Sequence, residues 1–128
     1  MKQIINVSFH SLIEMDPMEL SDYLRTEVNL ELPVSIDSKA DMYHATEMMA
    51  KASSYICYFK EMETLTRAIK RQKKRSGCST ETADNLLGCE EIFETYKRIA
   101  EQYYEQISKM MTMKRLMLDE CKILGRAT

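Results

Sequence analysis

The chain has 128 residues, of which 45% are hydrophobic and 30% are charged, and its formal net charge is −2. This composition excludes a disordered chain and a membrane-embedded one, and the length fits a single domain over residues 1–128. With only 3 Gly and 2 Pro in the chain, few turns and therefore few, long elements are expected.

Residues 1–15 are expected to form an N-terminal arm. Ile5, Val7 and Phe9 alternate with polar residues, a period of two that is typical of a short strand. A helix over residues 8–15 fits nearly as well, so strand and helix both remain open. The apolar run is too short for a signal peptide, and no window is long and apolar enough to span a membrane. We therefore expect a cytoplasmic protein.

A short helix is predicted within residues 16–32. Asp16 is a favoured N-cap residue, Pro17 fits the first helical position, and Glu19 fits the third. The helix should run to about Val28. Its buried residues should be Leu20, Tyr23 and Leu24, with Val28 as a further candidate.

Two long helices are predicted over residues 37–76 and 79–124. Ser35 to Ser38 offer N-caps for the first, and no helix breaker follows until Gly77. Basic residues in its last turns and a glycine just beyond them are typical of a helix C-terminus. Ser79 or Thr80 should then cap the second long helix.

The two long helices are predicted to pair. Apolar residues step by three and four along both, giving heptad seams of about four heptads. A turn at Gly77–Cys78 would bring together residues whose numbers sum to about 155. Phe59 should then face Tyr96, Ala52 should face Tyr103, and Asp41 should face Lys114. The predicted fold class is all-α: an antiparallel, coiled-coil-like hairpin of two long helices with the short N-terminal helix packed on it.

Paired helices leave further apolar positions open beside their seams. One short helix is too small to cover all of them, so a residual apolar stripe should suit a partner helix or a second copy of the chain. The candidate residues of this partner or oligomer stripe are Met42, Met49, Ile56, Tyr104, Met111 and Leu118.

A run of basic residues near the end of the first long helix is the most suggestive feature. Such a stripe can neutralise phosphates, although cations are also common at helix C-termini and the register brings acidic residues such as Glu90 alongside. No aromatic residue interleaves the run, so base stacking is not supported. The candidate nucleic-acid-binding residues are Arg67, Lys70, Arg71, Lys73, Lys74 and Arg75.

No pattern in the chain predicts a catalytic or metal site. Glycine-rich phosphate loops, serine elbows and paired catalytic carboxylates are absent, so we expect no enzyme, no cofactor and no small-molecule substrate. Asp41 and His44 have an i, i+3 spacing found in helical metal sites, but such sites need further carboxylates. The four cysteines form no C-x-x-C pair and should be reduced thiols. A redox role for Cys78 is the weaker alternative.

The order of elements resembles one known family. The pattern extends over residues 18–78: a short helix, the extended entry Val34-Ser35-Ile36-Asp37-Ser38, and a long helix whose end reads Ile69-Lys70-Arg71-Gln72-Lys73-Lys74-Arg75-Ser76-Gly77. It is similar to phage recombination mediator proteins, which load recombinase on single-stranded DNA. The resemblance implies a ring-forming oligomer that binds single-stranded DNA through basic residues. Here these would be Lys70, Arg71, Lys73, Lys74 and Arg75, without the aromatic residues expected just before the glycine.

The sequence therefore predicts a non-enzymatic helical interaction protein. One version is a nucleic-acid-binding accessory of recombination or repair. The alternative is a protein-binding adaptor or inhibitor without nucleic-acid contact, such as a phage-encoded modulator of a host or defence complex. A protein partner or a second copy is expected in both versions.

Overall fold

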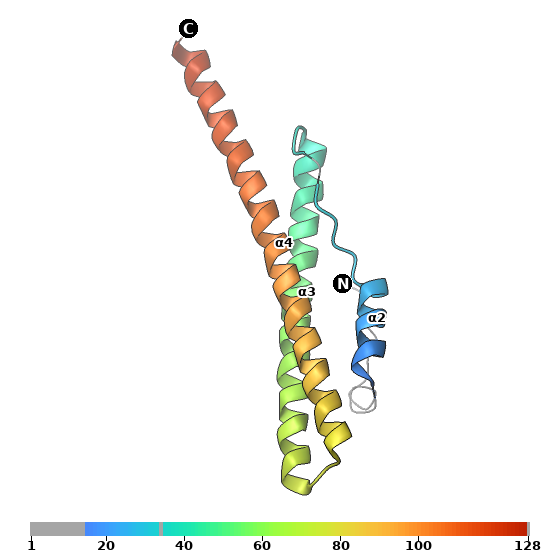
Figure 1. Ribbon diagram of the computed structural model, residues 1–128. Helices are drawn as coiled ribbons and strands as arrows, with labels where there is room; N and C mark the ends of the chain where they lie inside the picture. Colours follow the sequence, from blue (N-terminus) through green and yellow to red (C-terminus); the bar gives the residue numbers. More distant parts are fainter. Residues whose placement is uncertain (1–14, 34, 128) are drawn as a thin grey trace. The chain divides into compact units, whose positions relative to one another are not determined.

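The computed structural model describes residues 15–33 and 35–127, with side chains as far as Cys121. This part of the chain contains three helices, α2 (Pro17–Glu27), α3 (Lys39–Ser76) and α4 (Thr80–Ala127), and no strand (Figure 1). The prediction of an all-helical protein is confirmed for the described residues. The predicted N-terminal arm, with its strand or helix, lies almost entirely outside them. No helix within them has a segment long and apolar enough to cross a membrane.

Helix α2 begins where the sequence predicted. The Asp16 side chain accepts a hydrogen bond from the backbone N–H of Met18 at 3.3 Å, and Pro17 occupies the first helical position. The helix ends at Glu27, one residue before the expected Val28. Leu20 and Leu24 are fully buried as expected, whereas Tyr23 is half-buried.

Helix α3 begins with reciprocal capping bonds. Ser38 Oγ accepts from the N–H of Asp41 at 3.1 Å, and Asp41 Oδ2 accepts from the N–H groups of Ser38 and Asp37 at 3.2 and 2.9 Å. This is a capping box, which satisfies N–H groups that have no partner inside the helix. Lys114, which we expected opposite Asp41, instead forms its ion pair with Asp37 at 3.8 Å.

The connection between α3 and α4 is short. Gly77 has φ +80°, a left-handed conformation that glycine adopts without the steric cost paid by other residues. Ser79 Oγ then accepts a hydrogen bond from the N–H of Thr82 at 3.2 Å. The chain leaves one long helix and enters the next at the residues that the sequence predicted. Helix α4 continues past the predicted end at residue 124.

The two long helices pack against each other, and the described residues 15–29 and 55–99 belong to one compact unit. Phe59 and Phe93 are fully buried in it. The ring centroids of Phe59 and Tyr96 lie 5.7 Å apart, so this expected contact is present, and those of Phe59 and Phe93 lie 6.4 Å apart. Aromatic pairs at these separations stabilise a core beyond their buried area.

Helix α2 is held in this unit at both of its ends. Tyr55 donates its hydroxyl to the carbonyl of Glu27 and accepts from the N–H of Asn29, both at 3.4 Å. At the other end, a Cβ added to Gly88 would lie 2.6 Å from Cγ of Pro17. The glycine inside α4 is therefore explained by the close approach of α2.

The second compact unit contains the described part of residues 30–54 and 100–128. Its core contains Ile36, Ala45, Met48 and Ile107. Four methionines pack against this core while remaining partly buried: Met42, Met49, Met110 and Met111. Unbranched, polarizable methionine side chains fit irregular gaps of this kind.

Candidate functional site

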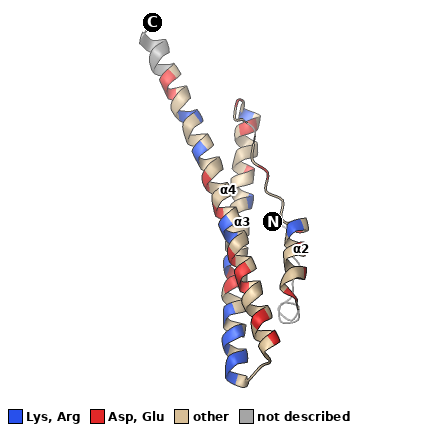
Figure 2. Ribbon diagram, viewed as in Figure 1, with Lys and Arg blue, Asp and Glu red and all other residues tan. Residues whose placement is uncertain are grey.

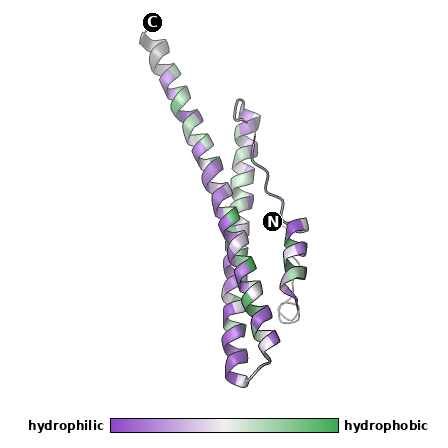
Figure 3. Cartoon of the chain, in the orientation of Figure 1, coloured by the Kyte–Doolittle hydropathy of each residue, from purple (hydrophilic) through white to green (hydrophobic). Residues whose placement is uncertain are grey.

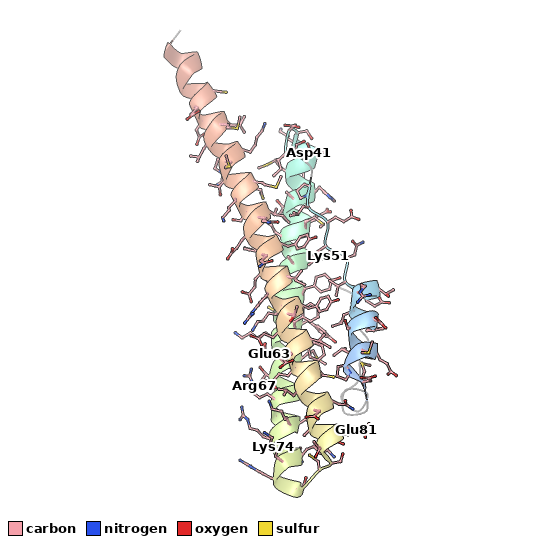
Figure 4. The ribbon with its side chains drawn as sticks, in the orientation of Figure 1. Asp41, Lys51, Glu63, Arg67, Lys74 and Glu81 are labelled. Carbon is pink, nitrogen blue, oxygen red and sulfur yellow. The ribbon has the colours of Figure 1, made fainter. Side chains whose placement is uncertain are left out.

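The predicted basic run divides into paired and unpaired residues. Arg67 donates to Glu90 Oε1 at 3.0 Å through Nε and to Glu63 Oε1 at 2.9 Å through Nη2. Lys70 Nζ donates to the other oxygen of Glu90 at 2.6 Å, and Lys97 Nζ donates to Glu63 Oε2 at 2.9 Å. We call these five residues the ion-pair network (Figure 4 labels Glu63 and Arg67). It joins α3 to α4 within the first unit.

The two acids of the ion-pair network are largely buried. The side chains of Glu63 and Glu90 are 10% and 12% exposed. Burial alone would raise the pKa of Glu90, but hydrogen bonds from Lys70 and Arg67 hold it below the ordinary 4.5. The hydrogen bond to Glu90 likewise raises the pKa of Arg67. Arg67 and Lys70 could bind a phosphate only by leaving the largely buried carboxylate of Glu90 unpaired, which is costly.

The remaining four predicted cations are placed differently. Arg71, Lys74 and Arg75 are exposed and Lys73 is half-buried. Among the described residues, none of the four forms an ion pair. They lie in the last two turns of α3, where Figure 2 shows Lys and Arg along the helix before the turn. We call Arg71, Lys73, Lys74 and Arg75 the basic end.

Three residues of the basic end share one side of α3. Arg71, Lys74 and Arg75 stand at positions i, i+3 and i+4, which are neighbours on a helix surface. Acidic Glu81 and Asp84 lie in the first turns of α4 and are also exposed. Neither is within ion-pair distance of the basic end in the described structure, so the four cations are available to an external anion.

The predicted partner stripe is only partly exposed. Met42, Met49 and Met111 pack against the core of the second unit, and Ile56 is half-buried. Tyr104 and Leu118 remain exposed. Leu118 lines a hollow of about 470 Å³ together with Lys39, Met42, Tyr43 and Thr46.

Among the described residues, a group of large exposed apolar side chains lies near the C-terminal end of α4, and the sequence pattern predicted only part of it. Met113 is 64% exposed and Leu116 is 59% exposed, and Met117 and Leu118 are half-exposed or more. Figure 3 shows hydrophobic residues continuing along α4 toward this end. The signal available in the sequence was that Met113 and Leu116 fall outside the heptad seam.

The cysteines and candidate metal ligands form no joint site. Cys89 is fully buried, and burial, helped by the charge of Asp16, raises its pKa to about 11. Cys57 and Cys121 are exposed, and Cys78 is half-buried. Within the described part of the chain, no three His, Cys, Asp or Glu side chains are placed to hold a metal ion.

Comparisons with protein-family models, with curated proteins and with solved structures find no match in any of the three.

Proposed function

We propose that the protein is a non-enzymatic helical interaction protein whose basic end binds single-stranded nucleic acid. The observation that carries this proposal is the exposed trio Arg71, Lys74 and Arg75 on one face of α3, unpaired among the described residues. Two further cations of the predicted run are engaged by buried acids and contribute structure instead. The binding surface is therefore smaller than the sequence run.

The arrangement that we propose for α3 and α4 is an antiparallel, coiled-coil-like hairpin. It is supported by the order of contacts: Phe59 meets Tyr96, whereas the later residue Arg67 meets the earlier residue Glu90. The tight turn at Gly77 supports the same arrangement. Such a hairpin presents the last turns of α3 at its tip, where a flexible polyanion can reach them.

Phosphate binding at the basic end follows from charge and spacing. Neighbouring positions on a helix face place cations about 5–6 Å apart at Cβ, close to the spacing of successive phosphates along an extended strand. The positive basic residues release counterions when they bind the polyanion, so affinity should fall with salt. Without aromatic residues in the run, binding should not depend on base stacking.

Within this class we favour an accessory role in recombination or repair. The support is the resemblance of the element order to that of phage recombination mediators, in which a long helix ends in a basic stretch and a glycine. The basic end and Gly77 belong to the stretch Ile69–Gly77, which is one part of this resemblance.

The proposal is tested by charge reversal with a matched control. A variant with Arg71→Glu, Lys74→Glu and Arg75→Glu is compared with one carrying Lys39→Glu, Lys60→Glu and Arg115→Glu, which are exposed elsewhere. Binding of labelled single-stranded DNA and RNA is followed by fluorescence anisotropy over a salt series. For three or four phosphates, the wild type should show a slope of log K against log salt of about −2 to −3.

The basic-end variant should lose binding and the control should retain it. Binding that is equal in both variants, or no binding by the wild type, would remove this proposal.

A second candidate, a protein-binding adaptor or inhibitor without nucleic-acid contact, is favoured by the exposed apolar residues of the second unit. The hollow beside Met42, Tyr43 and Leu118 could receive an apolar side chain of a partner. This candidate replaces the first if the wild type binds neither DNA nor RNA.

A further inference from the structure

The C-terminal part of α4 carries an exposed stripe that the core of the second unit does not use. Lys109, Met113, Leu116 and Glu120 follow one another at intervals of four, three and four, so they share one face of the helix. All four are exposed, and Met113 and Leu116 are among the most exposed large apolar residues described. We call these four residues the outer stripe.

The side of α4 that faces the core of the second unit is not the side that carries the outer stripe. Ile107 is fully buried against Ile36, Ala45 and Met48, and Met110 packs beside it. Lys114 is half-buried and pairs with Asp37. The outer stripe is therefore not an exposed edge of the core, and its two apolar residues need another explanation.

We propose that the outer stripe binds the same stripe of a second copy of this chain, with the two α4 helices antiparallel. The four stripe residues alternate between two heptad positions. In an antiparallel helix pair, a residue at one of these positions packs against a residue at the other position on the partner helix. Met113 of one copy then meets Leu116 of the other, and Lys109 meets Glu120. Both pairs belong to a single register, because the two residue numbers in each pair add up to the same value.

This register is self-complementary in both apolarity and charge. Two Met113–Leu116 contacts lie at the centre, and a Lys109–Glu120 ion pair lies outside each of them. Such an arrangement excludes water from the centre and sets the pairing by charge at the ends. A parallel pair would instead place Lys109 beside Lys109 and Glu120 beside Glu120, which is repulsive.

The residues beside the stripe are compatible with the same pairing. Met110 and Met117 lie on one side of it, Thr112 and Asp119 on the other, and no flanking pair in this register has like charge. Methionine adapts to a facing surface at little cost, which suits contacts at the edge of an interface. The contact area is small, so we expect a weak dimer whose population rises with protein concentration.

The experiment is sedimentation velocity on the full-length chain over a concentration series, using two single charge reversals. Lys109→Glu places two acids opposite each other in a homodimer, and Glu120→Lys places two bases opposite each other. Each should weaken self-association about tenfold. Arg115→Glu makes the same charge change as Lys109→Glu at an exposed position off the stripe and should leave self-association unchanged.

Mixing the two single variants supplies the decisive result. A mixed dimer regains both opposite-charge pairs, so the mixture should dimerise as the wild type does, and so should the double variant Lys109→Glu/Glu120→Lys. A wild type that stays monomeric at the highest concentration overturns the proposal. So does a mixture that stays monomeric while circular dichroism shows both variants to be as helical as the wild type.

This inference is independent of nucleic-acid binding, because the basic end and the outer stripe share no residue. Failure of either experiment leaves the other proposal intact.

Discussion

Nε of Arg67 on α3 lies 3.0 Å from Oε1 of Glu90 on α4, and this contact decides which basic residues of the chain are available. The same carboxylate also accepts from Lys70. Arg67 and Lys70, which belong to one basic run in the sequence, therefore stabilise the packing of the two long helices. Within this basic run as the structure describes it, the cations nearer to Gly77 are the ones left for an external anion.

Replacing Glu90 by Gln should destabilise the fold. The change removes the carboxylate that pairs with Lys70, while Arg67 keeps its ion pair with Glu63. Because Lys70 is left largely buried without its counter-charge, we expect the free energy of unfolding to fall by about 1–3 kcal/mol. The matched control is Glu94→Gln, since Glu94 pairs with Arg98 and its side chain is 40% exposed, against 12% for Glu90. Such a surface pair contributes about 0.2–1 kcal/mol. Urea unfolding followed by circular dichroism measures the free energy of unfolding of both variants. An equal decrease in the two variants would contradict the structural role of the ion-pair network.

Replacing Gly88 by Ala should loosen the contact between α2 and α4. Alanine is favoured over glycine inside a helix by about 1 kcal/mol, but its Cβ would overlap with the Pro17 ring. We expect net destabilisation and faster amide hydrogen exchange in α2. In a background carrying Pro17→Gly the overlap is absent, so the same Gly88→Ala change should become stabilising. A stabilising effect in both backgrounds would show that the close approach does not exist.

The helix boundaries could be predicted because their determinants are local. Asp16, Ser38, Gly77 and Ser79 each act on groups within a few residues. Asp16, Gly77 and Ser79 stand where the sequence placed the helix ends, whereas α3 begins at Lys39, after Ser38, and not at the predicted residue 37. Periodicity likewise identified the buried faces, including Phe59.

The candidate sites could be predicted less well because they depend on contacts between distant segments. The side chains of Glu63 and Glu90 determine which cations are paired, because each acid contacts a cation on the other long helix. The sequence pattern does not specify these side-chain contacts. Which apolar residues remain exposed depends on where the segment around Ile36 packs. Met42 and Met111 were predicted to be exposed but pack against the core that contains Ile36, whereas Met113 and Leu116 are exposed. Gly88 lowers helix propensity inside α4, and the sequence pattern does not reveal the close approach of Pro17 that accounts for it.

Acid should weaken the N-terminal cap of α3 through Asp41. The pKa of this carboxyl lies below the ordinary 3.8, chiefly because the backbone N–H of Asp37 donates to it, with further hydrogen bonds from Ser38. Since the pKa is lower in the folded state than in the unfolded one, the carboxylate stabilises the fold above pH 3.8, and this contribution is lost as the pH falls through the folded value. Asp41→Ala should therefore be less stable than the wild type at neutral pH.

The difference in unfolding free energy between Asp41→Ala and the wild type should shrink toward the value set by side-chain removal alone as the pH falls below 3.8. Urea unfolding of both proteins over a pH series measures this difference. Glu47→Ala, which removes an exposed carboxylate farther along α3, provides the control for side-chain removal. A difference for Asp41→Ala that stays constant across the same pH range would mean that the carboxylate charge does not stabilise the cap.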